Sequence, residues 1–228
     1  MNKRLIFIVT FILLGFVFLQ IPFTNIIGGS TQKFSLFDFF APTIGAFLAS
    51  GWGAVTVIVV KTFNVAVHHQ AFDLTAVIRL FPLAFAALYF GARKYKTLVG
   101  LIPLACMALF IMHPAGSQAW YYSLYWLIPV AASFTKKSLV MNSLGATFTA
   151  HAIGSVAFLY AFNLPAETWI ALIPVVFLER MLFTAGIAAS YVAMNSLVKA
   201  LATRLHLPFL NRLIKPEFVA SKKLLSYL

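Results

Sequence analysis

Five ionisable side chains lie inside strongly apolar stretches of this sequence: Asp38, Lys61, Arg79, Glu179 and Arg180. Moving a charge into an apolar medium costs at least about 3 kcal/mol on insertion scales, so each of these groups must face protein groups or water. Structural ion pairing and contact with a bound molecule are both open to them. Because Glu179 and Arg180 are adjacent, they project about 100° apart on a helix, and we do not expect them to pair with each other.

Polar residues of the first half form one candidate binding set. Asp38 precedes Pro42 by four residues, which suits the first turn of a helix capped by Asp38. Lys61 and Asn64 are three residues apart and would share one helix face. Together with Arg79, the residues Asp38, Lys61 and Asn64 are our candidates for polar contacts to a small-molecule substrate.

Aromatic residues gather in the segment 120–126 and could hold a flat ring. The candidates for stacking are Trp120, Tyr125 and Trp126. A belt of aromatic side chains at a membrane surface would have the same sequence pattern. A stacking wall for a heterocyclic ligand is the alternative, and the deeper position of Trp126 favours such a pocket.

A polar stripe follows in the segment 141–162. Thr147, His151 and Ser155 are spaced by four residues, so they share one face of a helix. Such a face either holds helices together or lines a substrate site, and His151 is then a candidate substrate-binding residue. The His68-His69 pair lacks two further ligands at suitable spacing, so we expect no metal site, and we expect no cofactor.

The elements that carry these residues must be membrane helices. Of the 228 residues, 62% are hydrophobic and 10% are charged, whereas about a quarter of the residues of a soluble domain are charged. Backbone polar groups in lipid must be satisfied within the spanning structure, which leaves helices or a closed barrel. The apolar runs are continuous rather than alternating, so we predict an all-α, polytopic transmembrane bundle with membrane lipid as a partner.

The bundle is predicted over residues 1–200, with about 6–8 spans. The apolar runs cover about 5–24, 36–68, 75–91, 97–112, 119–134, 141–162 and 168–199. The run 36–68 suits two short helices joined at Gly51-Trp52-Gly53 better than one long span. With that division the basic clusters near residues 3–4, 93–96, 136–137 and 199 onward fall on one face. This pattern predicts cytoplasmic termini and a multi-pass protein of the cell inner (plasma) membrane.

Residues 201–228 form a separate basic tail. Arginine and lysine alternate there with leucine, isoleucine and phenylalanine, and Pro208 and Pro216 divide the stretch. This composition is typical of amphipathic helices on an anionic membrane surface, and a solvated cytoplasmic tail is the alternative. We attribute the net charge of +12 to membrane topology and to this tail. Nucleic-acid binding, which would need a basic soluble face, is not expected.

The segment 34–64 carries the most specific pattern. Small residues at 45, 49 and 53 recur every four positions and allow helices to approach to backbone contact. The chain here resembles the substrate-binding S components of energy-coupling-factor (ECF) vitamin transporters, riboflavin-type members especially, mainly over residues 1–95. The resemblance is carried by Asp38, Pro42, Gly45, Gly51, Gly53, Lys61 and Asn64.

The resemblance implies a membrane solute carrier or substrate-capture subunit for uptake of a small vitamin-like molecule. It also implies an ECF transmembrane coupling protein and ATPases as partners. S components usually have six spans, fewer than the eight counted here, and the first span lacks the Ala-x-x-x-Ala pattern common in members that share an energising module.

Two other classes of function are open. One is a non-transporting membrane anchor, sensor or assembly subunit, and the other is a membrane enzyme acting on lipid. The sequence has no Walker A, His-Glu-x-x-His, Gly-x-Ser-x-Gly or Cys-x-x-Cys motif, so we predict that it is not an enzyme. An internal cavity with converging polar groups would favour a carrier, and a solid bundle would favour an anchor.

Overall fold

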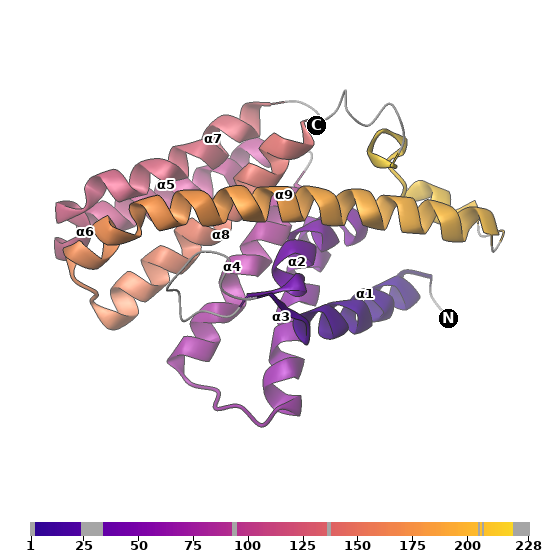
Figure 1. The fold of residues 1–228 in the computed structure, drawn as a ribbon, viewed down its shortest axis with the longest axis horizontal. Coiled ribbons are helices and arrows are strands. Elements are labelled where there is room, and N and C mark those ends of the chain that lie inside the picture. The colour runs from indigo at the N-terminus through magenta and orange to yellow at the C-terminus, as the bar shows by residue number, and fades with distance from the viewer. Residues whose placement is uncertain are drawn as a thin grey trace.

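The computed structural model describes residues 3–23, 34–92, 95–135, 138–204, 206 and 208–220, which are arranged almost entirely as helices (Figure 1). The α-helices are α1 (Lys3–Leu19), α2 (Leu36–Leu48), α3 (Ser50–Val67), α4 (Leu74–Gly91), α5 (Lys96–Met112), α6 (Pro114–Gln118), α7 (Leu127–Phe134), α8 (Leu139–Phe162) and α9 (Ala166–Arg204). Three 3₁₀ helices, η1 (Trp120–Trp126), η2 (Pro208–Arg212) and η3 (Pro216–Phe218), accompany them. A short antiparallel pair joins β1 (Pro22–Phe23) to β2 (Phe34–Ser35). The predicted helical fold class is confirmed for these ranges.

Within the described ranges, four helices are long and apolar enough to cross a membrane: α3, α4, α8 and α9. The apolar part of α1 and the helices α2 and α5 are shorter, at 10–17 residues. Large apolar side chains point outward from several helices. Leu13 of α1 is 61% exposed and Leu178 of α9 is 53% exposed. Extensive apolar surface of this kind is typical of a protein that meets an apolar environment.

The apolar run 36–68 forms two helices, as expected, but the break lies earlier than predicted. The chain turns at Ala49, which has a φ of 75°. Gly51 and Gly53 therefore lie in the first turn of α3 rather than between the helices. The predicted helix 119–134 also differs, because it divides into the 3₁₀ helix η1 and the helix α7.

Three glycines meet where α2, α3 and α4 cross. A Cβ atom on Gly45 would overlap the carbonyl oxygen of Ala87. A Cβ atom on Gly53 would overlap the backbone of Gly45, and one on Gly91 would overlap the carbonyl group of Gly45. Only the missing side chains allow the three backbones to come this close. The close helix approach predicted from the small residues is therefore confirmed at Gly45 and Gly53.

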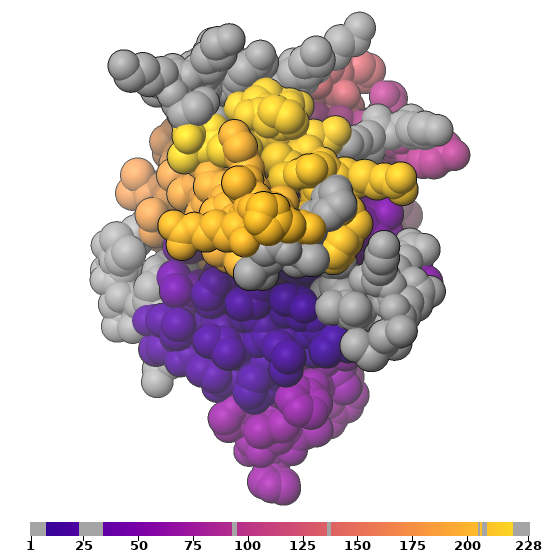
Figure 2. All heavy atoms as spheres, turned by 90° about the vertical axis from the view of Figure 1, so that its right-hand side faces the viewer, coloured from indigo at the N-terminus to yellow at the C-terminus, as the bar shows by residue number. Residues whose placement is uncertain are grey.

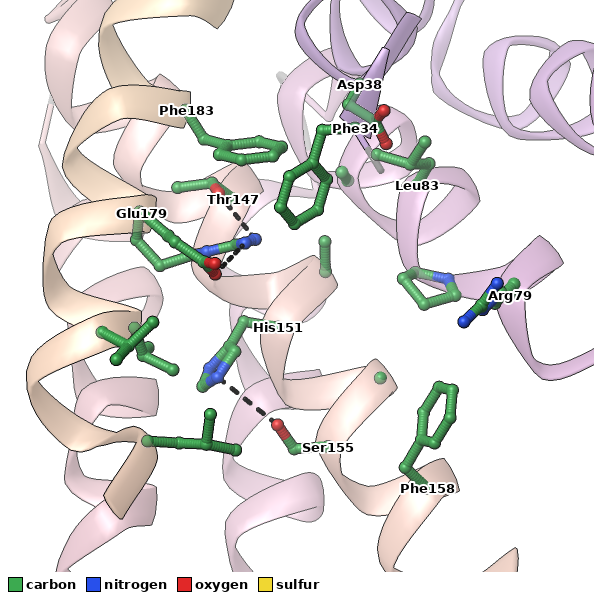
Figure 3. Close-up of a pocket in the computed structure, with 18 of the residues that line it drawn as sticks. Phe34, Asp38, Arg79, Leu83, Thr147, His151, Ser155, Phe158, Glu179 and Phe183 are labelled. Atoms are coloured by element: carbon green, nitrogen blue, oxygen red, sulfur yellow. Dashed lines mark hydrogen bonds and ion pairs between the residues drawn. The ribbon is translucent and has the colours of Figure 1, made fainter. Parts of the chain in front are cut away.

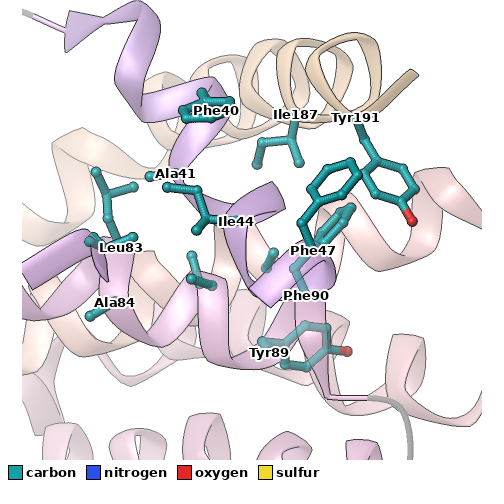
Figure 4. Packing of buried hydrophobic residues seen from close by; sticks show 14 of the residues in the cluster. Phe40, Ala41, Ile44, Phe47, Leu83, Ala84, Tyr89, Phe90, Ile187 and Tyr191 are labelled. Atoms are coloured by element: carbon teal, nitrogen blue, oxygen red, sulfur yellow. The ribbon is translucent and has the colours of Figure 1, made fainter. Parts of the chain in front are cut away.

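Helix α2 lies at the centre of the fold and packs against α1, α3, α4 and α9. Nine of its 13 residues are buried. Figure 4 shows Ile44 and Phe47 of α2 between Leu83 of α4 and Ile187 and Tyr191 of α9. Because α2 touches four helices, it sets the distance between the first half of the chain and α9.

A second apolar cluster joins α5, η1, α8 and α9. The ring of Phe110 lies at its centre, with no measurable exposure. Its ring centroid lies 5.2 to 5.5 Å from those of Tyr122, Trp126 and Trp169. Contacts of this kind between aromatic rings add to the free energy of burial. They hold α5 against η1 and α9.

The described C-terminal residues fold back onto the last turns of α9. The backbone N–H of Lys215 donates to the side-chain oxygen of Asn195, and that of Ala220 donates to the hydroxyl of Ser196, both at 2.9 Å. Figure 2 shows this C-terminal stretch in yellow beside α1 in indigo, at one end of the molecule. The tail is thus attached to the bundle by specific hydrogen bonds.

Two short 3₁₀ helices occupy the part of the tail where amphipathic α-helices were expected. The first begins at Pro208 and the second at Pro216. Each proline lacks a backbone N–H, so an α-helix cannot continue through it without losing a hydrogen bond. The predicted loop of residues 25–33, the basic pairs at 93–94 and 136–137, and the last eight residues of the tail lie outside the described residues.

Replacing Asn195 with alanine should release this part of the tail. Asn195 is fully buried, and its amide also donates to the carbonyl oxygen of Tyr191 at 2.9 Å. Loss of the acceptor for the Lys215 N–H removes about 1 kcal/mol of net hydrogen-bond stabilisation. We expect faster cleavage within 208–220 in limited proteolysis, whereas the exposed control variant Gln118→Ala should behave as the wild type. An unchanged cleavage rate would mean that Asn195 does not retain the tail.

Candidate functional site

A cavity of about 720 Å³ lies between α2, α4, α8 and α9. Lys61 of α3, Tyr122 of η1, Phe34 of β2 and Leu164, between α8 and α9, complete its wall. Figure 3 shows side chains from these elements pointing toward a common space, with Asp38 and Phe183 at one end and Phe158 at the other. The polar side chains of the lining are Asp38, Lys61, Arg79, Tyr122, Thr147, His151, Ser155, Glu179 and Arg180. A volume of this size falls within the range of small-molecule sites.

Asp38 joins the cavity wall and caps α2. Its Oδ2 atom accepts hydrogen bonds from the backbone N–H of Ser35 at 2.7 Å and from the Ser35 hydroxyl at 3.1 Å. Asp38 thus takes part in the cap of α2, but as the third helical residue of a capping box, whereas the N-cap itself is Ser35 and not Asp38 as predicted. Pro42, however, lies inside α2 rather than in its first turn, because the helix already begins at Leu36.

Lys61 and Arg79 come together on the α3–α4 side of the cavity. The Lys61 Nζ atom donates to the backbone carbonyl oxygen of Arg79 at 2.5 Å. The guanidinium group of Arg79 extends from α4 in Figure 3 and is exposed. This wall therefore carries two cationic groups, and the Lys61 bond links the two helices.

Arg180 and Glu179 form the charged part of the α9 side. The Nη2 atom of Arg180 lies 3.3 Å from Oε2 of Glu179, so the expectation that these neighbours would not pair was wrong. Both side chains are long enough to turn toward each other despite the angle between their Cβ atoms. Arg180 also donates to the hydroxyl of Thr147 at 3.4 Å, and its guanidinium carbon lies 4.3 Å from the ring centroid of Phe183.

His151 is fixed by side chains from η1 and α8. The indole N–H of Trp126 donates to His151 Nδ1 at 3.0 Å. An indole N–H can only donate, so Nδ1 is unprotonated and the proton of the neutral ring is on Nε2. The Tyr122 hydroxyl lies 2.7 Å from Nε2 and 3.2 Å from Oγ of Ser155. Trp126 therefore selects the tautomer of a histidine that lines the cavity.

The structure brings together four of the eight predicted site residues. Asp38, Lys61, Arg79 and His151 all line the cavity. Asp38, Lys61 and Arg79 come from the consecutive helices α2, α3 and α4, whereas His151 comes from the distant helix α8. The three charged residues and the histidine of the predicted set thus have a common location.

The three predicted stacking residues lie outside the cavity lining. Trp126 is completely buried behind His151. The Tyr125 hydroxyl donates to the carbonyl oxygen of Ile173 at 3.1 Å. Trp120 is 50% exposed, at the start of η1. Trp126 acts on the cavity through His151, and the other two have no contact with it.

Asn64 lies away from the cavity, at the contact of α3 with the end of α1. Its side-chain oxygen accepts a hydrogen bond from Nε2 of Gln20 at 2.8 Å. The Gln20 oxygen in turn lies 3.0 Å from Nε2 of His68. These bonds hold the start of the segment between α1 and β2.

Other aromatic residues line the cavity instead. They are Phe34, Tyr122, Phe158, Trp169 and Phe183. Three of them come from α8 and α9. Along α9 the lining residues recur every three or four positions, at Trp169, Leu172, Val176, Arg180 and Phe183. That periodicity is the signal for a common helix face, but it does not distinguish a cavity wall from a solid core. Among the described residues, His, Cys, Asp and Glu form no group that could hold a metal ion.

Comparison with known proteins gives one distant relative and no family. The chain is 24% identical over 206 residues to an uncharacterized protein of Methanocaldococcus jannaschii, covering 80% of this chain and 68% of the relative. No protein-family model matches the chain, and no solved structure matches it.

Proposed function

We propose that this chain is a membrane solute carrier or substrate-capture subunit for uptake of a small vitamin-like molecule, similar to the S component of an ECF transporter. The observation that supports it most is the cavity of about 720 Å³, lined by charged and hydrogen-bonding side chains from five α-helices and from η1. Charged groups inside an apolar helical protein are expected to contact protein, water or a transported molecule. A solid bundle would have favoured an anchor or assembly subunit.

The proposed location is the inner (plasma) membrane, with six to eight crossings and both termini in the cytoplasm. Support comes from the four long apolar helices, the three shorter ones and the outward apolar side chains. The orientation follows from the basic clusters, which favour the cytoplasmic side. The tail from residue 201 would then lie at the inner surface, close to anionic lipid headgroups.

The energy for uptake is proposed to come from partner proteins. The sequence contains no nucleotide-binding motif, so hydrolysis of ATP would take place in another subunit. A coupling protein and ATPases of the ECF type are the partners that fit the sequence resemblance. The cavity would capture the substrate, and its partners would drive release.

The test is the retention of a small molecule during purification. We expect the wild type, purified from cells in lipid nanodiscs, to release a small molecule on denaturation that mass spectrometry detects in stoichiometric amount. Lys61→Ala removes a cation of the wall, and Trp126→Ala removes the donor that orients His151. Each should retain about tenfold less, the factor expected for losing one hydrogen bond to a polar or charged group.

The matched controls make the same substitutions outside the cavity. Lys199→Ala and Trp52→Ala change exposed residues of α9 and α3 and should leave retention unchanged. A wild type that carries no small molecule, or equal retention in the cavity variants and the controls, would contradict the proposed function.

A further inference from the structure

The charges around the cavity are unequal. Three cationic residues, Lys61, Arg79 and Arg180, face two acidic ones, Asp38 and Glu179. The Asp38 carboxylate is already engaged by Ser35 and lies at the N-terminus of α2, where the helix dipole partly offsets its charge. Counting Arg79, whose side chain is exposed, the lining therefore carries one more cation than it has carboxylates.

Arg180 is the most deeply placed of these cations. It is 9% exposed and lines the cavity, and its Nε atom has no hydrogen-bond partner among the described residues. The two terminal nitrogens have only long contacts, at 3.3 and 3.4 Å, with Glu179 and Thr147. A buried guanidinium group left with an unused N–H is unfavourable unless an acceptor completes it. An incoming carboxylate or similar anion could supply that acceptor.

The His151 network presents another hydrogen-bond donor to the cavity. Four X–H groups are available, from Trp126, His151, Tyr122 and Ser155, and Oγ of Ser155 also lies 3.4 Å from Nε2 of His151. Because Nε2 is itself protonated and only one proton fits between the two hydroxyl oxygens, these contacts use three of the four protons. One O–H proton is therefore left over, on Tyr122 or on Ser155. Both of these hydroxyl groups line the cavity. The wall needs a hydrogen-bond acceptor at this point.

The two donor positions are separated along α8. Thr147 contacts Arg180, and Ser155 contacts Tyr122, eight residues further along the same helix. At about 1.5 Å of rise per residue, this places them about 12 Å apart. Aromatic side chains of the lining, including Trp169 and Phe158, lie on the wall alongside. This spacing suits an elongated flat molecule.

We propose that the cavity selects a flat ring compound that carries an anionic group for Arg180 and a hydrogen-bond acceptor for the Tyr122–Ser155 hydroxyls. The inference rests on the proposed function, because it names the chemical class of the captured molecule. The anion binds beside Phe183 at the Glu179–Arg180 end, and the acceptor edge of the ring points toward Ser155.

The test uses three probes of nearly equal shape. Quinoline-6-carboxylate has both the anion and the ring acceptor, quinoline-6-carboxamide lacks the charge, and naphthalene-2-carboxylate lacks the ring nitrogen. Binding to the full chain in nanodiscs is measured by calorimetry. We expect the first probe to bind at least about tenfold more tightly than either of the others, as lost charged or neutral hydrogen bonds predict.

Two substitutions at the Glu179–Arg180 end of the cavity distinguish direct recognition of the anion by Arg180 from a purely structural role of this residue. Arg180→Gln should remove the preference for carboxylate over carboxamide. Glu179→Gln should increase that preference, because it removes the carboxylate that competes for Arg180. A merely structural role would weaken all probes equally in both variants. Equal binding of the carboxylate and the carboxamide by the wild type, or no binding of any probe, would overturn the inference.

The retention experiment separates the proposal of an anionic ligand from the proposal that the protein is a carrier. If the wild type retains a neutral or cationic molecule on purification and loses it in Lys61→Ala and Trp126→Ala, the carrier proposal stands and the anionic class is wrong. If no molecule is retained either, both proposals fail.

Discussion

The variant Gly45→Val is expected to lose the folded bundle at temperatures at which the wild type remains intact. The new side chain would overlap the Ala87 carbonyl group, and Gly53 and Gly91 already fill the space on the other sides. The atoms that the new side chain would meet belong to the backbone of Ala87 and Gly91, so a change of side-chain rotamer cannot relieve the overlap. The helices α2, α3 and α4 must separate, and we expect a loss of about 3 kcal/mol or more, at the upper end for overpacked cores.

The measurement is the melting temperature in nanodiscs, followed by size-exclusion chromatography after heating. Gly51→Val is the matched control, since a Cβ atom on Gly51 meets nothing within 4 Å. The control should melt close to the wild type. Equal melting temperatures for Gly45→Val and Gly51→Val would show that α2, α3 and α4 do not approach as closely as described.

Filling the cavity from Gly154 is expected to abolish small-molecule retention without unfolding the protein. Gly154 lines the cavity on α8, and its nearest neighbour for an added Cβ is Cγ of Pro82, at 3.5 Å, an ordinary contact. A phenylalanine side chain can therefore enter the cavity without displacing backbone. It would take up space needed by a ligand, and we expect at least about a hundredfold loss of affinity, as for a ligand that must displace a packed side chain.

The control for Gly154→Phe is Gly51→Phe, which adds the same side chain at an open position outside the cavity. Retention of the co-purified molecule is measured by mass spectrometry, and the melting temperature is measured in parallel. Loss of retention in Gly154→Phe alone, at an unchanged melting temperature, is the expected result. Full retention in Gly154→Phe would place the ligand elsewhere on the protein.

The helices could be predicted largely from the continuous apolar runs. The division of 36–68 into two helices also followed from length, but the position of the break did not. Gly51 and Gly53 suggested a turn, whereas Gly53 is used for contact with Gly45 and the chain turns at Ala49. A glycine that serves a turn and one that serves close packing have the same local pattern, and only the neighbouring helix distinguishes them.

The candidate site was predictable for isolated charges and less so for aromatic residues. Asp38, Lys61 and Arg79 stand out because charges in apolar helices need an explanation. The stacking role assigned to Trp120 and Tyr125 depended on which side of η1 faces inward, and a 3₁₀ helix places its side chains at a different angle from the expected α-helix. No pattern within the segment 119–134 indicates that change of helix type.

The pairing of Glu179 with Arg180 could not be obtained from helix geometry alone. The angle between adjacent Cβ atoms argues against a contact, yet both side chains bend into the same cavity and meet at 3.3 Å. Space beside a helix thus decides whether neighbours can pair. The space is formed by α2, α4 and α8, whose arrangement depends on contacts far apart in sequence.

Cysteine labelling in nanodiscs distinguishes a water-accessible binding cavity inside a membrane-embedded bundle from a solid bundle. In a Cys106→Ala background, Gly154→Cys places a thiol in the cavity, and Leu178→Cys places one on the 53% exposed outer face of α9. A small water-soluble methanethiosulfonate reacts with thiolate, which forms in water and not in lipid. Once the co-purified molecule has been removed, we predict rapid labelling at position 154 and none at 178 until the protein is unfolded. Labelling at 178 with none at 154 would contradict both the membrane setting and the cavity.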